Sequence, residues 1–341
     1  MSALLTAGFL WFASGDTPAQ VWNGAQEVAI PRFAGGGPQP ALFYVPAGAE
    51  RELPGEPVPL LVALHTWSGD YRQESGAEYL DQCKTRRWVL IHPDFRGPNV
   101  RPEACGSAGA IADVLDAVAY ARKHANIDSR RIYLVGVSGG GYMALVMAHR
   151  APGLWAGVSA WVPISDLARW HRQSKEATPA RKYYRDLEAV FGGPPDSDER
   201  RAAYRRRSPL FHLEAARGVP IDINAGIHDG HAGSVPIDHS LDAFNVLATA
   251  NGHPELRVAA ERIDQMTRDE RVPDALQGQP EEEPRRSHAI LFQRTAGPAR
   301  VTLFDGGHEI EVPAALDWLE RQHKKPSANS RPLSARLLLD E

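Results

Sequence analysis

The chain has 341 residues, of which 43% are hydrophobic and 23% are charged, and its formal net charge is −4. These values are ordinary for a globular protein, so they exclude extensive disorder, and the length suits one large α/β domain or two small ones. The slightly negative net charge gives the protein no overall positive potential, which argues against nucleic acid as a partner. No apolar run reaches the length of a membrane span.

The first 24 residues predict an N-terminal extension. Residues 3–13 are apolar and resemble the central part of a secretory signal, although no Lys or Arg precedes them. We therefore expect a secreted or periplasmic protein, with a cytoplasmic one as the alternative. Cys83 and Cys105 are too few for a disulfide scaffold and would pair only in an exported protein.

Eight short segments predict the strands of one sheet. They are residues 26–31, 41–46, 60–65, 88–93, 131–136, 157–162, 221–225 and 301–304. The last six are continuous apolar runs, as expected of parallel strands that are buried on both faces. Helical segments separate most of them, and residues 110–124 show the apolar spacing of an amphipathic helix. This alternation predicts an α/β fold with a mostly parallel eight-stranded sheet, helices on both faces and a site at the carboxyl ends of the strands.

Two stretches interrupt the alternation. Residues 165–213 are rich in Arg, Tyr, Trp and Pro and predict a small helical cap. Residues 255–286 are highly charged and predict an exposed helix followed by a mobile loop. Residues 324–341 predict a weakly docked or disordered tail. The remaining pattern indicates a single catalytic domain over residues 25–323.

Ser138 lies at the tip of a predicted strand-to-helix turn. Glycines two positions before and two positions after it remove the Cβ atoms that would crowd such a turn. The N–H groups at the start of the following helix point at the same place and would stabilise a developing oxyanion. We therefore expect Ser138 to be a nucleophile. We expect the oxyanion donors to be the amides of Gly139 and of Trp67, with Thr66 as the alternative to Trp67.

A serine hydroxyl needs a base that takes its proton. His308 is the best candidate among the 13 histidines because it directly follows the last predicted strand. His65, His92, His228 and His231 also lie near strand ends, but none of them follows the final strand.

The base in turn needs a carboxylate that orients it. Asp229 follows the predicted strand 221–225 and is the preferred acid, with Asp166 and Asp238 as alternatives. The histidines on either side of Asp229 have too little spacing for a metal site, so neither a metal nor a cofactor is expected.

Several side chains are candidates for contact with substrate. Arg96 and Arg101 follow the predicted strand 88–93 and would bind the carboxylate of an acidic sugar, or else pair structurally with nearby Asp94 or Glu103. Tyr142 and Trp161 are further candidates for substrate contact. The indole of Trp67 either forms a wall of the acyl pocket or belongs to the core.

With these motifs the chain resembles the α/β-hydrolases, and among them the prolyl-oligopeptidase and esterase D branch. The matching residues are 131–141, the loop from Asp229 to Pro236, and Gly306-Gly307-His308. Many members place Val-Pro closer behind the acid than Val235-Pro236 stands here, which implies an insertion in this loop. Residues 64–70 and 92–99 resemble bacterial proteins described as peptidases or carbohydrate esterases, related to acetylxylan, feruloyl and pectin-type esterases.

The resemblance implies a serine carboxylic-ester hydrolase that works through an acyl-enzyme and removes ester groups from polysaccharides or oligosaccharides. The alternative is a prolyl-oligopeptidase-like peptidase. Relatives of that kind usually carry a large N-terminal propeller domain, whereas the predicted sheet begins near the start of this chain. A non-catalytic binding protein on the same scaffold would require that one triad member be missing. The oligomeric state stays open.

Overall fold

The computed structural model describes residues 22–33, 35–276 and 280–324. Residues 1–21 of the expected N-terminal extension and residues 325–341 of the expected tail lie outside these ranges. No helix in the described ranges combines the length and the apolar character that crossing a membrane requires.

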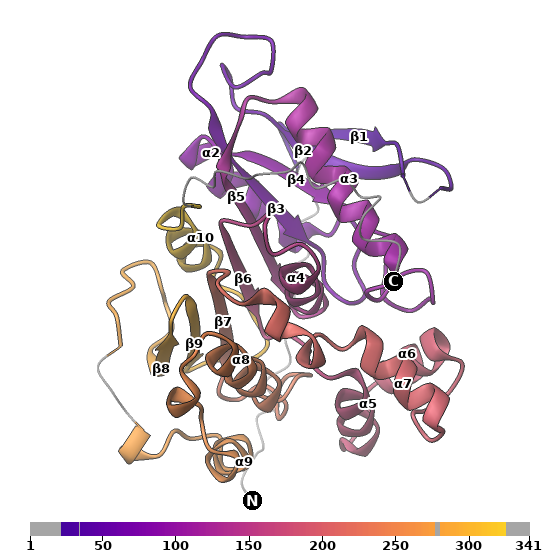
Figure 1. Cartoon of the computed structure of the whole chain (residues 1–341), viewed down its shortest axis with the longest axis vertical. Coiled ribbons are helices and arrows are strands. Elements are labelled where there is room, and N and C mark those ends of the chain that lie inside the picture. The colour runs from indigo at the N-terminus through magenta and orange to yellow at the C-terminus, as the bar shows by residue number, and fades with distance from the viewer. Residues whose placement is uncertain (1–21, 34, 277–279, 325–341) are drawn as a thin grey trace, which may run out of the picture.

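One mixed sheet organises the described residues, with the strand order β1-β2-β4-β3-β5-β6-β7-β9-β8 (Figure 1). The strands are β1 (Gln26–Ile30), β2 (Gln39–Tyr44), β3 (Val58–Leu64), β4 (Val89–Pro93), β5 (Ile127–Val137), β6 (Gly157–Trp161), β7 (Ile221–Gly226), β8 (Ile290–Ala296) and β9 (Ala299–Phe304). The six strands from β4 to β9 in this order are parallel, while β1 and β2 at one edge and β8 at the other are antiparallel. The expected fold class, an α/β-hydrolase-like sheet flanked by helices, is confirmed.

The expected number of eight strands is wrong, because the described residues form nine. The additional strand is β8, which pairs with β9 across a turn at Gly297. Most β8 residues are only partly buried, and Gln293, Arg294 and Thr295 interrupt its apolar character. An edge strand with one open side does not need the continuous apolar run that identifies central strands.

Helices cover both faces of the sheet and create two cores. One core contains side chains from α3 (Ala108–His124), α4 (Gly139–Arg150) and α8 (Asp238–Ala250), and the other contains side chains from α2 (Ala77–Arg86) and α10 (Val312–Glu320). Strand β3 supplies alternate residues to the two cores, as its pleat requires. Cys105 belongs to the first core and Cys83 to the second, so the two buried cysteines are free thiols in this structure.

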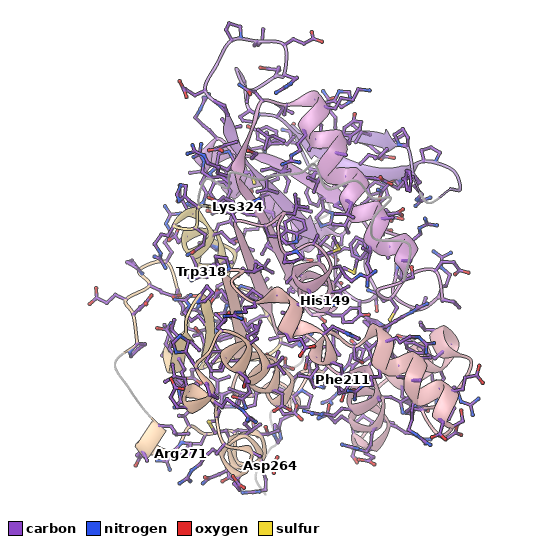
Figure 2. The ribbon with its side chains drawn as sticks, in the orientation of Figure 1. His149, Phe211, Asp264, Arg271, Trp318 and Lys324 are labelled. Carbon is purple, nitrogen blue, oxygen red and sulfur yellow. The ribbon has the colours of Figure 1, made fainter. Side chains whose placement is uncertain are left out.

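The remaining helices lie outside these two layers. In the expected cap stretch, α5 (Leu167–Glu176), α6 (Tyr183–Phe191) and α7 (Asp198–Arg207) form a group at one side of the molecule (Figure 1). In the charged stretch, α9 (Ala260–Asp269) is mostly exposed, and Asp264 and Arg271 lie at the molecular edge (Figure 2). The short 3-10 helices are η1 (Glu74–Gly76), η2 (Pro209–Phe211), η3 (Leu213–Ala216), η4 (Pro254–Leu256) and η5 (Asp274–Leu276).

The end of the charged stretch differs from the expected mobile loop. The side chain of Arg286 is only 2% exposed and forms ion pairs with Glu283 at 2.7 Å and Glu311 at 3.3 Å. It also donates a hydrogen bond to Asn224 in β7 at 2.8 Å. Glu283 forms a second pair with buried Arg300 at 2.6 Å. This segment is therefore fixed against the sheet by a buried ionic network, because its charges meet partners from distant strands.

Candidate active site

Ser138 occupies the turn between β5 and α4 with φ 58° and ψ −118°. A positive φ is strained for a residue with a side chain, and this is the backbone conformation that presents a nucleophile above a sheet. The Ser138 N–H donates to the Trp161 carbonyl at 2.8 Å, which fixes the turn to β6. A Cβ on Gly136 would overlap the carbonyl of Gly140, so the tight turn requires glycine at position 136.

His308 links the nucleophile to the acid. It lies in the loop between β9 and α10, and its Nε2 is 2.8 Å from Ser138 Oγ. Its Nδ1 is 2.7 Å from Asp229 Oδ2. In the tautomer that fits both contacts, Nδ1–H donates to the carboxylate and Nε2 accepts from the serine hydroxyl. The structure thus brings Ser138, His308 and Asp229 into one hydrogen-bonded chain, the arrangement that makes a serine nucleophilic.

The loop after β7 is folded around the carboxylate of Asp229. The Asp229 side chain has no exposed surface, and its Oδ1 accepts from the N–H of Gly230 at 2.9 Å and of Val235 at 3.0 Å. A Cβ on Gly233 would overlap Asp229 Oδ1 and would lie 2.6 Å from His308 Cβ. The insertion expected between Asp229 and Val235-Pro236 therefore packs directly over the acid and the base.

The two alternative acids have other roles. Asp166 caps the N-terminus of α5 and accepts from the N–H groups of Ala168 at 3.0 Å and Arg169 at 3.2 Å. Asp238 is 3.3 Å from Arg169 and accepts from Gln173 at 2.9 Å. Among the three candidate carboxylates, Asp229 is the one that contacts His308.

The alternative histidines are also engaged away from Ser138. The ring nitrogens of His65 lie 2.9 Å and 2.8 Å from the carbonyl oxygens of Thr66 and Asp94, and His92 contacts the Tyr71 carbonyl at 3.1 Å. His228 lies 2.8 Å from Glu270 and 3.3 Å from Asp305, and these carboxylates raise its pKa. His231 contacts the Thr267 carbonyl at 2.6 Å. Within the described ranges, no group of three or more His, Cys, Asp or Glu side chains is arranged to hold a metal ion.

The two expected oxyanion donors lie side by side. A Cβ on Gly139 would overlap the backbone nitrogen of Trp67, so glycine is required for this close approach. Neither the Gly139 N–H nor the Trp67 N–H donates to another described residue, whereas the Thr66 N–H is occupied by Gln73 Oε1 at 2.8 Å. The geometry therefore favours Trp67 over Thr66 as the second donor to a developing oxyanion.

Helices α5 and α6, in the stretch expected to form a cap, contact residues on both sides of this site. The indole N–H of Trp67 donates to Asp186 of α6 at 3.2 Å. The Trp67 ring packs edge-on against the ring of Trp170 in α5, with 4.7 Å between the ring centroids. The indole N–H of Trp170 donates to the Ser234 carbonyl at 2.8 Å. The Trp170 ring stacks on the Tyr183 ring, with 4.8 Å between the ring centroids. These contacts are not predicted from the sequence, in which the aromatic content of residues 165–213 is the one signal for them.

Polar groups complete the junction between the cap and the site. Lys182 Nζ lies 2.8 Å from Ser68 Oγ, beside the oxyanion loop. Arg181 donates to the Gly230 carbonyl at 2.9 Å, in the loop that carries the acid. The surroundings of the triad are consequently both aromatic and polar.

The four residues expected to contact substrate have different positions. Arg96 pairs with fully buried Asp113 at 2.9 Å, whereas Arg101 is exposed and donates to the Arg96 carbonyl at 2.9 Å. Both arginines line a cavity of about 250 Å³. Tyr142 and Trp161 are completely buried, and they donate to the Arg207 carbonyl and to Ser159 Oγ, both at 2.9 Å. Their expected contact with substrate is not supported, because they have no exposed surface.

One segment of the chain is similar to a known protein family. Residues 107–262 match the model of the prolyl oligopeptidase family, a segment that includes Ser138 and Asp229 and ends before His308. The chain's sequence matches no curated protein significantly.

The fold is shared with several solved hydrolases. An acylaminoacyl peptidase in complex with Z-Gly-Gly-Phe-chloromethyl ketone is 16% identical with a TM-score of 0.59, and the match covers 92% of this chain and 44% of that one. A puromycin-hydrolysing peptidase from Mycobacterium tuberculosis is 17% identical with a TM-score of 0.53, over 87% of this chain and 38% of that one. A thermostable esterase is 15% identical with a TM-score of 0.50, over 89% and 64%.

The fold and the site define an α/β-hydrolase-fold protein. A segment that covers a little under half of the chain is similar to the prolyl oligopeptidase family of serine hydrolases. The chain spans less than half of the length of the acylaminoacyl peptidase and of the puromycin-hydrolysing peptidase.

Proposed function

We propose that this serine hydrolase cleaves carboxylic esters of carbohydrates through an acyl-enzyme. The observation that carries the hydrolase chemistry is the chain of 2.8 Å and 2.7 Å contacts that joins Ser138, His308 and Asp229. Ser138 Oγ bonds to the ester carbonyl carbon while its proton passes to His308 Nε2. The bond to the alcohol then breaks and the alkoxide takes that proton. A water molecule attacks the acyl-enzyme in the same way and returns the proton to Ser138.

The surroundings of the triad support a polar, hydroxylated substrate. Tyr183 is partly exposed beside Trp170, and an aromatic face of this kind suits the C–H surface of a sugar ring. Lys182 and Ser68 are exposed next to the oxyanion loop and offer hydrogen bonds to sugar hydroxyls.

The cavity that is lined by three arginines and two carboxylates, Arg32, Arg96, Arg101, Asp94 and Glu103, supports recognition of an acidic sugar, with Arg101 in the main role. Arg96 is committed to Asp113, whereas the exposed Arg101 guanidinium keeps donors for a bidentate contact with a carboxylate. We expect Arg101→Ala to slow hydrolysis of uronic-acid esters while sparing neutral sugar esters. If Arg101→Ala hydrolysed both kinds of ester at the wild-type rates, this part of the proposal would be wrong.

A peptidase is the second candidate function. The matched family and two of the structural neighbours are named for peptide cleavage, and the same triad chemistry cuts amides. A parallel assay on acetylated, feruloylated and methyl-esterified sugars and on aminoacyl amides separates the two, with Ser138→Ala as the inactive control. Turnover of sugar esters at higher kcat/KM supports the first proposal. Turnover of amides alone would replace it with the second.

A further inference from the structure

A second hydroxyl group lies at the nitrogen that serves as the base. Ser234 Oγ is 3.3 Å from His308 Nε2, the same atom that is 2.8 Å from Ser138 Oγ. Ser234 is 9% exposed, so its hydroxyl lies largely inside the site. The motifs that identify the triad do not include this residue.

The position of Ser234 is fixed by its neighbours. Its carbonyl oxygen accepts from the Trp170 indole of the cap at 2.8 Å. On one side, Val235 donates its N–H to Asp229 at 3.0 Å. On the other side, Gly233 leaves no room for a Cβ against Asp229 and His308. The contacts of both chain neighbours therefore hold the Ser234 hydroxyl beside His308. Its position does not depend on a freely moving loop.

We propose that Ser234 is a positioning residue that holds His308 while Ser138 carries the acyl group. This inference rests on the proposed acyl-enzyme mechanism. In the free enzyme, the Ser138 hydroxyl donates to Nε2. In the acyl-enzyme that proton has left with the alcohol, so the acylated oxygen has no hydrogen to donate. The Ser234 hydroxyl then donates to neutral Nε2 and keeps the imidazole ring in place.

The contact also suits the second half of the reaction. A distance of 3.3 Å is at the long end for a hydrogen bond, so an arriving water molecule can replace the Ser234 hydroxyl as the donor to Nε2. The water oxygen bonds to the acyl carbon, the bond to Ser138 Oγ breaks, and the water proton passes through Nε2 to Ser138. While Nε2 carries that proton, Ser234 Oγ accepts from it. No atom is transferred through Ser234.

Ser234 should consequently matter more for deacylation than for acylation. During acylation Ser138 itself orients the base, so loss of Ser234 removes a redundant contact. During deacylation Ser234 is the side-chain hydroxyl that remains at Nε2. A residue that only stabilised the loop would slow both steps together.

The two steps can be measured separately with 4-nitrophenyl dimethylcarbamate. Release of 4-nitrophenol reports carbamoylation of Ser138, and recovery of activity after removal of the reagent reports decarbamoylation. For Ser234→Ala we expect a carbamoylation rate within about threefold of wild type and a decarbamoylation rate that is lower by about tenfold. The tenfold loss is smaller than the full contribution of a general base, because His308 is still present. Ser234→Thr restores the hydroxyl and should recover the decarbamoylation rate. Ser129→Ala, at an exposed serine, should leave both rates unchanged.

The outcomes distinguish this inference from the proposed function. Equal slowing of both steps, or an unchanged decarbamoylation rate in Ser234→Ala, would overturn the role of Ser234 and leave the triad untouched. Failure of the wild-type protein to release 4-nitrophenol, with no adduct on Ser138, would overturn the acyl-enzyme mechanism and this role with it. Thermal unfolding of each variant verifies that the fold is kept.

Discussion

Gly233 lies against Asp229 so closely that a single added methyl group would overlap the carboxylate oxygen Oδ1, and it would lie 2.6 Å from His308 Cβ. We therefore predict that Gly233→Ala displaces the acid or the base. A misplacement of about 1 Å in such a site costs roughly 100-fold in rate. The variant should lose about that much in kcat/KM on an activated ester.

The control for this variant is Gly37→Ala. A Cβ at Gly37 has no atom within 4 Å, so the substitution should change neither the activity nor the melting temperature. If Gly233→Ala retained wild-type kcat/KM, the inserted loop could not be packed on the acid and base as described.

The second prediction concerns the identity of the acid. Asp229→Asn should lower kcat by about 10⁴-fold, because an amide favours the wrong imidazole tautomer and does not stabilise the imidazolium. Asp166→Asn removes a carboxylate that caps α5 instead and should cost less than about tenfold. Steady-state kinetics of both variants at one pH compares them directly. A larger loss for Asp166→Asn would show that the acid is misassigned.

The third prediction concerns the buried ionic network. Arg286→Ala leaves Glu283 and Glu311 buried without one of their partners, and breaking a buried pair costs about 3–5 kcal/mol. The neighbouring Arg285 is 49% exposed and 3.5 Å from Asp317, so Arg285→Ala should cost less than about 1 kcal/mol. Urea unfolding of the two variants gives both values. Similar free energies of unfolding would mean that the Arg286 side chain is not buried in an ionic network.

The fourth prediction concerns the pH dependence of stability. His239 is buried, and its Nδ1 accepts from the Ser165 N–H at 3.1 Å. Burial lowers its pKa from 6.5 to about 3. Between these values the unfolded chain binds a proton that the folded protein excludes, so His239 lowers the free energy of unfolding as the pH falls from 6.5 toward 3.

The variant His239→Asn isolates this contribution. Its free energy of unfolding should fall less than that of the wild type between neutral pH and about pH 4.5, because the variant lacks one proton-linked group. Other groups that titrate in this range are common to both proteins and cancel in the comparison. Identical pH slopes would show that His239 is protonated in the folded state as readily as in the unfolded chain.

Part of the site could be predicted because its demands are local. The sharp turn at Ser138 leaves no room for a Cβ at position 136, because it would overlap the carbonyl of Gly140. This requirement for glycine involves only residues that are close together in the sequence. His308 and Asp229 could be placed because parallel strands end at the same edge of a sheet, so residues just after β7 and β9 must lie close together. These inferences need only strand order and chain direction.

The rest depends on contacts between distant segments. Arg286 resembles part of a solvated loop until Asn224 and Glu311 are seen beside it. Tyr142 lies in the helix that follows Ser138, and Trp161 lies at the end of β6, but the side chains of both are buried in the cores. Ser234 and Trp170 meet across 64 positions of the chain, and no spacing within the sequence predicts that contact.

The most direct test of the account is covalent labelling by a fluorophosphonate, with the modified residue located by mass spectrometry. We predict one adduct, on Ser138 Oγ, that forms at least about 100-fold more slowly in His308→Ala because the base is lost. An adduct on another residue, or equal labelling of wild type and His308→Ala, would contradict the assignment of this hydroxyl and imidazole as nucleophile and base.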